Sequence, residues 1–258
     1  MKMTFDEYIQ NPMGRENAVI SNRIMYRNLY TEKLDKILVR EAGKIDIKAY
    51  QVGKRYICYL KIPSEIVPKF YYDVLIEFTP PKGLFPEADL KKYTVRFYSN
   101  DPSFVFTFAH AFIKNDMFIK DFEDKMSKKA IKDKAKEKNP YDQVGYVKSL
   151  YFAYLIMSRR GYFSKTRYVD TYSEKALKRE ITDADKKIQD REDAAKSLSA
   201  QRKKDREKLK KISSPSNTLS PDIPVSQTSN NRIKKVGTIS SSRKGIKSSN
   251  RVGKIKKK

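Results

Sequence analysis

The sequence predicts an α+β fold, in which a small antiparallel sheet packs with Phe-rich helices and is followed by a long charged helix and a disordered basic C-terminal arm. Three observations support this. Apolar residues alternate in several runs between residues 45 and 99, as in strands. They recur every three to four residues in the flanking segments, as in helices. Beyond residue 200 the chain becomes basic and poor in apolar residues.

The first predicted helix spans residues 17–40, and Gly43 is its expected stop. Three or four strand-like runs follow, and in the second of them Tyr56 and Cys58 begin one alternating face. Because the connections are short, an antiparallel meander is favoured over a parallel sheet. The predicted strands cover residues 45–51, 55–62, 71–78 and 92–99.

Two further helices are expected in the middle of the chain. Ser99–Pro102 is a helix-start signal, because a short polar side chain can cap free backbone N–H groups and proline suits the first turn. The Phe-rich helix that it opens should span about 102–118. The Lys-rich residues 124–139 are expected to be a solvated short helix or a mobile loop. The next helix should cover about 141–160 and end at Gly161.

A long amphipathic helix of roughly 40 residues is predicted over 171–212, opened by a capping box at 171–174. Its apolar seam is thin and its other faces are charged. Three arrangements remain open for it: packing on the body, self-association, or free extension. The seam positions are Leu177, Ile181, Ala184, Ile188, Arg191, Ala195, Leu198, Arg202, Asp205, Leu209 and Ile212.

These elements divide the chain into four parts: an N-terminal segment (1–14), an α+β globular domain (15–170), the long charged helix (171–212) and the disordered basic arm (213–258). Residues 213–231 are rich in Ser, Pro and Asn. The remainder of the arm repeats glycine at Gly237, Gly245 and Gly253 among basic residues. Such a segment buries too little apolar surface to offset the entropy of folding.

The distribution of positive charge predicts contact with a polyanion. The formal net charge is +25, and residues 201–258 hold 18 Lys/Arg against 3 Asp/Glu. Nucleic acid, most readily double-stranded DNA, is the favoured partner, and an acidic protein, a membrane surface or a passive or localising tail are alternatives. The candidate nucleic-acid-binding residues are Arg202, Lys203, Lys204, Arg206, Lys210, Lys211, Arg232, Lys234, Lys235, Arg243, Lys244, Lys247, Arg251, Lys254, Lys256, Lys257 and Lys258.

The strands suggest a second way to bind nucleic acid. Tyr59, Tyr72 and Tyr98, with Arg96, would stack bases if they lay on an exposed sheet face. The favoured interpretation is that these aromatic side chains belong to the core. The arm has no aromatic residue after Tyr172, so sequence-specific contacts are not expected there.

No catalytic residue, metal site or cofactor is predicted. His110 is expected to be buried and hydrogen-bonded, and Cys58 to be a core residue. Asp73 and Glu77, with Lys82 downstream, weakly match a metal-dependent nuclease, but Pro80-Pro81 interrupts the pattern. Phosphate-binding glycine loops of the nucleotide-hydrolase or dinucleotide-binding type are missing from the sequence.

The sequence also bears on compartment. A single cysteine cannot form an intrachain disulfide, which suits a reducing environment. The N-terminus lacks the apolar stretch of a signal peptide, and no apolar run reaches 18 residues. A protein that is neither secreted nor membrane-spanning is therefore expected, and its oligomeric state is left open.

Two stretches resemble uncharacterised structural proteins of tailed bacteriophages: VRFYSNDPSFVFTF at 95–108 and NPYDQVGYVKS at 139–149. The resemblance covers roughly residues 15–190 and carries no functional residues over. It implies a virion-associated protein close to packaged or entering DNA, located in the virion or in the host cytoplasm. The expected function is a non-enzymatic structural or architectural protein that contacts DNA non-specifically through its arm, while its body docks on other structural proteins. The alternatives are a replication- or transcription-associated DNA-binding protein and a metal-dependent nuclease.

Overall fold

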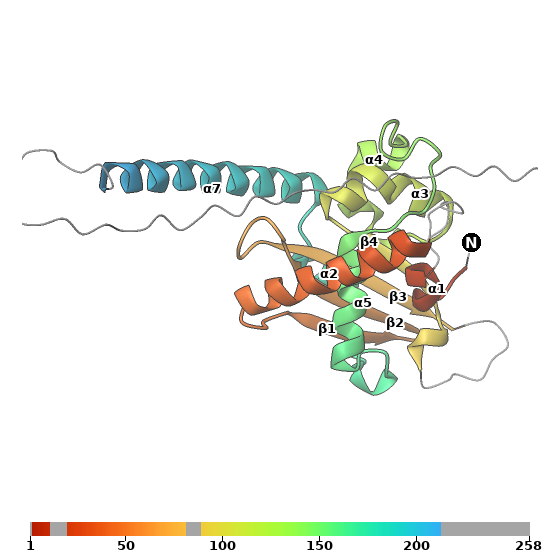
Figure 1. Cartoon of the computed structure of the whole chain (residues 1–258). Coiled ribbons are helices and arrows are strands. Elements are labelled where there is room, and N and C mark those ends of the chain that lie inside the picture. Colours follow the sequence, from red (N-terminus) through yellow and green to blue (C-terminus); the bar gives the residue numbers. More distant parts are fainter. Residues whose placement is uncertain (1, 11–19, 81–88, 213–258) are drawn as a thin grey trace, which may run out of the picture. The chain divides into compact units, whose positions relative to one another are not determined.

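The computed structural model describes residues 2–10, 20–80 and 89–212, with side chains described for all of these except 20–27 and 210–212. The predicted α+β class is confirmed: helices surround one four-stranded antiparallel sheet with the order β1-β2-β3-β4 (Figure 1). The strands are β1 (Ile47–Val52), β2 (Arg55–Pro63), β3 (Tyr71–Thr79) and β4 (Thr94–Ser99). The predicted arm lies outside the described residues.

The strands lie close to their predicted positions. Gly53, at φ +59°, makes the turn between β1 and β2, which pair from Val52 with Arg55 up to Ile47 with Leu60. Strand β4 begins two residues later than predicted, because residues 90–92 form a short 3-10 turn. The Asp89 side chain caps that turn by accepting a hydrogen bond from the backbone N–H of Lys91.

One face of the sheet packs on an aromatic core beneath α1 (Phe5–Gln10), α2 (Ile20–Arg40) and α5 (Lys148–Arg160) (Figure 1). The Phe5 ring lies 5.1 Å from that of Phe97 and 5.2 Å from that of Tyr154. Tyr8 is fully buried, and its hydroxyl donates to Gly145 O and accepts from Val147 N. Burying one such ring stabilises the fold by about 2–3 kcal/mol. The core thus includes side chains from the segment 1–14.

The opposite face of the sheet is covered as well. The Tyr98 ring packs on Phe118 and Phe122, and α6 (Glu174–Glu180) contributes the buried Leu177. Tyr59, Tyr72 and Tyr98 are all buried, which confirms the favoured interpretation that these aromatic side chains belong to the core and leaves none of them exposed for base stacking. For Tyr59 and Tyr98 the reason is tertiary, because the segments around residues 116–126 and 174–188 cover their face of the sheet. Tyr72, which precedes Asp73 on β3, lies on the other face.

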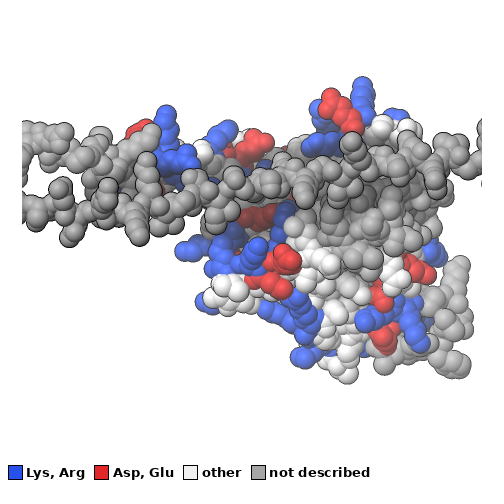
Figure 2. Space-filling view, in the orientation of Figure 1, with Lys and Arg blue, Asp and Glu red and all other residues white. Residues whose placement is uncertain are grey.

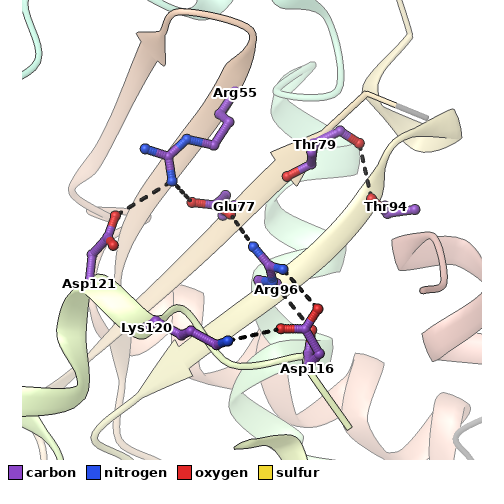
Figure 3. Close-up of polar contacts among 8 residues, drawn as sticks. All are labelled: Arg55, Glu77, Thr79, Thr94, Arg96, Asp116, Lys120 and Asp121. Carbon is purple, nitrogen blue, oxygen red and sulfur yellow. Dashed lines mark hydrogen bonds and ion pairs between the residues drawn. The ribbon is translucent and has the colours of Figure 1, made fainter. Parts of the chain in front are cut away.

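A charged network lies at this second face (Figure 3). Glu77, only 1% exposed, accepts from Arg55 at 2.9 Å and pairs with Arg96 at 3.5 Å. Arg96 also binds Asp116 at 2.9 Å, and this ion pair holds the pKa of the Asp116 carboxyl below its usual value. Arg96 is therefore part of the framework that fixes residues 116–121 to the sheet.

Asp73, on the same face of β3 as Glu77, is the buried acceptor of a second cluster. Its carboxylate accepts from the Tyr59 hydroxyl at 2.7 Å and from Asn100 Nδ2 at 2.7 Å. The backbone N–H of Thr182 adds a third donor at 3.3 Å. The two carboxylates considered for a nuclease are thus engaged in structural contacts. In the described ranges, no group of His, Cys, Asp and Glu side chains is arranged to hold a metal ion.

The Phe-rich helix begins as predicted, with Pro102 in its first turn and Asp101 accepting from the Ser103 N–H at 2.9 Å. Residues 104–108 form a π-helix, which continues as α3 (Ala109–Lys114). The helix ends four residues earlier than predicted. Residues 117–119 instead pair with β4, where the backbone of Phe97 bonds to Met117 O and to Ile119 N.

The Lys-rich segment contains the short helix α4 (Lys128–Lys132), which confirms the first of its two expected forms. Helix α5 begins at Lys148, so the predicted start at 141 is wrong, although its end at Gly161 is confirmed. Residues 139–147 are not helical because Asp142 adopts φ +54° and Gly145 lies directly against the Phe108 ring.

Replacing Gly145 with alanine is expected to destabilise the protein by about 1–3 kcal/mol, as overpacking does in well-packed cores. A Cβ atom at this position would lie 2.7 Å from Phe108 Cζ and closer still to Cε1. Thermal unfolding measures the cost. The matched control is Gly53→Asn, where a Cβ meets open space and asparagine tolerates the positive φ. Equal melting temperatures for the two variants would contradict the close contact between Gly145 and the Phe108 ring.

His110 is hydrogen-bonded as predicted, with Nδ1 2.8 Å from Asp142 Oδ1, but its side chain is 28% exposed rather than buried. Lys114 Nζ lies 3.2 Å from the other Asp142 oxygen. Cys58 is buried in the core, as predicted. The His110–Asp142–Lys114 contacts attach the loop 139–147 to α3.

Asp142→Asn is expected to cost about 1–2 kcal/mol near pH 7. Burial alone would raise the pKa of the Asp142 carboxyl, but hydrogen bonds from His110 and Lys114 outweigh burial and hold it below its usual value. The stabilisation is therefore present at pH values above the unfolded-state pKa of the carboxyl and is lost as the pH falls through the lower folded-state pKa. Unfolding of both proteins across this range should show the difference shrinking in acid. A stability difference that stays constant across this pH range would mean that the loss does not come from the charge of Asp142.

The predicted helix over 171–212 is in fact two helices, α6 and α7 (Ala184–Ile212). The N-cap is Ser173, whose Oγ accepts from Ala176 N, rather than Thr171. The break at 181–183 has a tertiary cause. Thr182 donates its backbone N–H to Asp73, and its carbonyl accepts from Asn100 Nδ2. In a continuous helix both of these backbone groups would be hydrogen-bonded within the helix instead.

Candidate nucleic-acid interface

The first part of α7 is anchored to the body. Ala184 and Ile188 are buried, and Lys187 Nζ lies 4.0 Å from Asp73 and 5.0 Å from the centre of the Phe70 ring. Of the three arrangements left open by the sequence, packing on the body therefore holds for this part of the helix.

The second part of α7 is exposed. Every residue from Ser199 to Leu209 is exposed, and Leu209 itself is 65% exposed. The change follows from the seam, where Arg202 and Asp205 take the positions at which an apolar residue would extend the packing. The basic part of the helix is thus presented to solvent.

The charge of α7 changes along its length. Residues 184–200 hold four Lys/Arg and four Asp/Glu, whereas residues 201–212 hold seven Lys/Arg and two Asp/Glu. Cations at the C-terminal end of a helix interact favourably with its dipole, so this distribution is compatible with a stable helix. Figure 2 shows Lys and Arg side chains on α7 where the grey atoms do not cover it.

The cations at this end form no ion pair with the side chains that the structure describes. Within the described part of the chain, none of Arg202, Lys203, Lys204, Arg206 and Lys208 forms an ion pair, and Asp205 is bonded by Gln201 at 3.0 Å. In the anchored part, by contrast, Lys187 and Lys196 each have a carboxylate within 4.0 Å. The five side chains are exposed and form no ion pair with the described residues, so their charges can attract an anion.

The structure locates only part of the predicted binding residues. Arg202, Lys203, Lys204 and Arg206 lie on the exposed end of α7, next to Lys208, which the sequence-based prediction omitted although its charge counts toward the same basic stretch. Lys210 and Lys211 lie on the last turn of α7, with side chains outside the described residues. The remaining candidates lie outside the described residues altogether: Arg232, Lys234, Lys235, Arg243, Lys244, Lys247, Arg251, Lys254, Lys256, Lys257 and Lys258.

Comparisons of the chain with protein-family models, with curated proteins and with solved structures find no match. None of the helices in the described ranges has the length and apolar character needed to cross a membrane. Function is therefore inferred from the residues of this chain alone.

Proposed function

We propose that this protein is a non-enzymatic structural or architectural protein, associated with a phage particle, that contacts double-stranded DNA non-specifically through its basic C-terminal arm. One observation carries the proposal: the exposed end of α7 presents five cations without acidic partners among the described residues. It leads directly into residues 213–258, which hold eleven Lys/Arg and a single acidic residue, Asp222.

Phosphate contact explains this composition. Lys and Arg neutralise phosphates and release bound counterions, and the interleaved Ser, Gly and Asn residues add small donors. If roughly 5–10 of the cations engage, affinity should fall by roughly 10³–10⁵ between about 50 and 200 mM salt. Because no aromatic residue follows Tyr172, the arm lacks the means to stack on bases. The proposed contact is therefore between the arm and the phosphate backbone of duplex DNA, with little preference for sequence.

The body supplies the folded part of this design. Its core is closed on both faces of the sheet, so the fold has its own source of stability apart from the arm. In the proposal, the body docks on other structural proteins of the particle, and the protein is located in the virion or in the host cytoplasm. The phage association comes from the resemblance of residues 95–108 and 139–149 to structural proteins of tailed phages.

Truncation to residues 1–212 tests where DNA contact is located. We expect the truncated chain to keep the thermal transition of the full chain almost unchanged and to lose retention on random duplex DNA. Unchanged retention after truncation would overturn the proposal. In a second experiment, random and defined duplexes compete for the protein. A regulatory or replication-associated protein would prefer particular sites, whereas non-specific contact predicts that both duplexes compete equally.

A further inference from the structure

Two aromatic side chains face solvent, in contrast to the rest of the body. Phe106 is 52% exposed and Tyr141 is 81% exposed. Among the aromatic side chains that the structure describes, these are the only exposed ones; the others are buried or half-buried. Exposing an aromatic ring forgoes much of the stabilisation that its burial would give, so two such rings in one region of a body that buries its other described aromatic side chains need an explanation.

The two rings come from segments that lie against each other. Asn139 Nδ2 donates to the carbonyl of Thr107, the residue after Phe106, at 3.1 Å. Gly145 packs directly on the ring of Phe108. The loop carrying Tyr141 therefore lies on the π-helix that carries Phe106. We call this region, residues 104–114 and 126–147, the lysine lobe; α3 and α4 lie side by side in it (Figure 1).

The lysine lobe is strongly basic. Residues 126–138 hold six Lys and only two acidic residues. Lys134 Nζ lies 3.4 Å from the carbonyl of Pro140, the residue before Tyr141, so one of these cations contacts the segment that carries the Tyr141 ring. Figure 2 shows Lys and Arg side chains at this end of the body. Six of the lysines are exposed and, within the described part of the chain, form no ion pair: Lys128, Lys129, Lys132, Lys134, Lys136 and Lys138.

The rings are held on a fixed framework. The Asn139 side chain makes three hydrogen bonds, to Thr107 O, to Gln143 O and from Gln143 N. His110 and Lys114 bind Asp142, and the buried Tyr8 hydroxyl bonds both Gly145 and Val147. A π-helix such as the one carrying Phe106 is rare and is often associated with function. Fixed aromatic rings among exposed cations are typical of surfaces on which single-stranded bases stack.

We infer that the lysine lobe is a second nucleic-acid contact, which binds single-stranded nucleic acid by stacking bases on Phe106 and Tyr141 while its lysines contact phosphates. This inference rests on the proposed function, because both take nucleic acid as the partner. It differs in that the lysine lobe, rather than the arm, binds nucleic acid that is single-stranded rather than duplex. The arm, which lacks aromatic residues, contacts duplex backbone, whereas the lysine lobe takes unpaired bases.

The test uses the full chain. Fluorescence anisotropy measures its binding to a 20-residue oligothymidylate and to a 20-base-pair random duplex. The variant Phe106→Ala/Tyr141→Ala should bind the single strand roughly 10- to 100-fold more weakly, as expected for the loss of stacked bases. Its duplex affinity should stay within about twofold, because duplex bases are not available for stacking. The control is Val39→Ala/Val169→Ala, which removes exposed apolar side chains elsewhere and should change neither affinity.

Two further variants separate stacking from other effects. Phe106→Leu/Tyr141→Leu keeps apolar area but removes the rings, and should lose single-strand affinity like the alanine variant. Lys134→Gln/Lys136→Gln/Lys138→Gln should reduce the single-strand salt slope by about 2, at about 0.7 per phosphate contact. If the alanine variant melts well below the parent, the single substitution Tyr141→Ala decides, because that side chain is largely solvent-exposed.

Each outcome decides one of the two claims. Unchanged single-strand affinity in the ring variants overturns the lysine-lobe inference, and so does an equal loss on duplex and single strand. Neither result affects the arm, whose contribution is read from duplex binding after truncation. Conversely, loss of single-strand binding in the ring variants, together with duplex binding that survives truncation, supports the lysine lobe and overturns the arm.

Discussion

Asp73→Ala is expected to destabilise the protein by about 3–5 kcal/mol, because it removes a buried carboxylate and leaves its donors without an acceptor. The Tyr59 hydroxyl, Asn100 Nδ2 and the Thr182 N–H all donate to this carboxylate. For a folded body of this size, the loss corresponds to a fall in melting temperature of about 10 °C. Thermal unfolding of the variant measures it directly.

The control for this prediction is Asp46→Ala. Asp46 is a largely exposed carboxylate 3.9 Å from Lys61, and its loss should change stability by less than about 0.5 kcal/mol. Amide hydrogen exchange gives a second, local measurement beside thermal unfolding. The backbone amide of Thr182, which donates to Asp73, should exchange with solvent faster in Asp73→Ala than in the parent. Equal melting temperatures for the two variants would show that Asp73 does not attach the α6–α7 junction to the sheet.

Replacing the eleven Lys/Arg residues of 232–258 with Gln in the full chain is expected to weaken duplex DNA binding by roughly 10³-fold or more at about 150 mM salt. The physical reason is the loss of phosphate contacts and of the counterion release that accompanies them. The folded body should be unaffected, because the core that the structure describes is formed by residues between Met3 and Ile188. Anisotropy with a random duplex measures the affinity, and the melting temperature verifies the fold.

A control on the body tests whether position matters or only net charge. Lys36, Lys44 and Lys54 are exposed on the body, away from the basic end of α7 in the sequence. Their replacement by Gln should change duplex affinity by less than about twofold, through the general field of the protein alone. If this variant loses as much affinity per charge removed as the arm variant does, the arm is not a distinct binding element.

Local patterns were sufficient to predict the sheet. Alternation in 55–62 and 71–78 and the short connections between strands predicted a meander that is found with small shifts at its ends. The cap at Asp101 and the stop at Gly161 are also local features and were correctly predicted. The exposed basic end of α7 follows from the weakening of its apolar seam, which is visible in the sequence.

The errors share a physical origin, because each depends on a contact between distant residues. The break between α6 and α7 is set by Asp73 and Asn100, about 80 to 110 residues earlier in the chain. The loop before α5 is held by contacts with distant residues, including Thr107 with Asn139 and Tyr8 with Val147. The tyrosines of the second sheet face are buried because the segments that cover it come later in the chain. The exposed rings of the lysine lobe could not be separated from core aromatics by periodicity, since burial is decided by tertiary packing.

The most direct test of the account is the salt dependence of duplex binding by the full chain and by the arm variant with Gln at its eleven cationic positions. The account predicts a slope of log affinity against log salt of roughly −5 to −9 for the full chain, from about 0.9 for each of the phosphates contacted. In the arm variant the slope should be less than half as steep, with only the basic end of α7 remaining. Equal slopes for the two proteins would contradict the central claim and place the duplex contact outside residues 232–258.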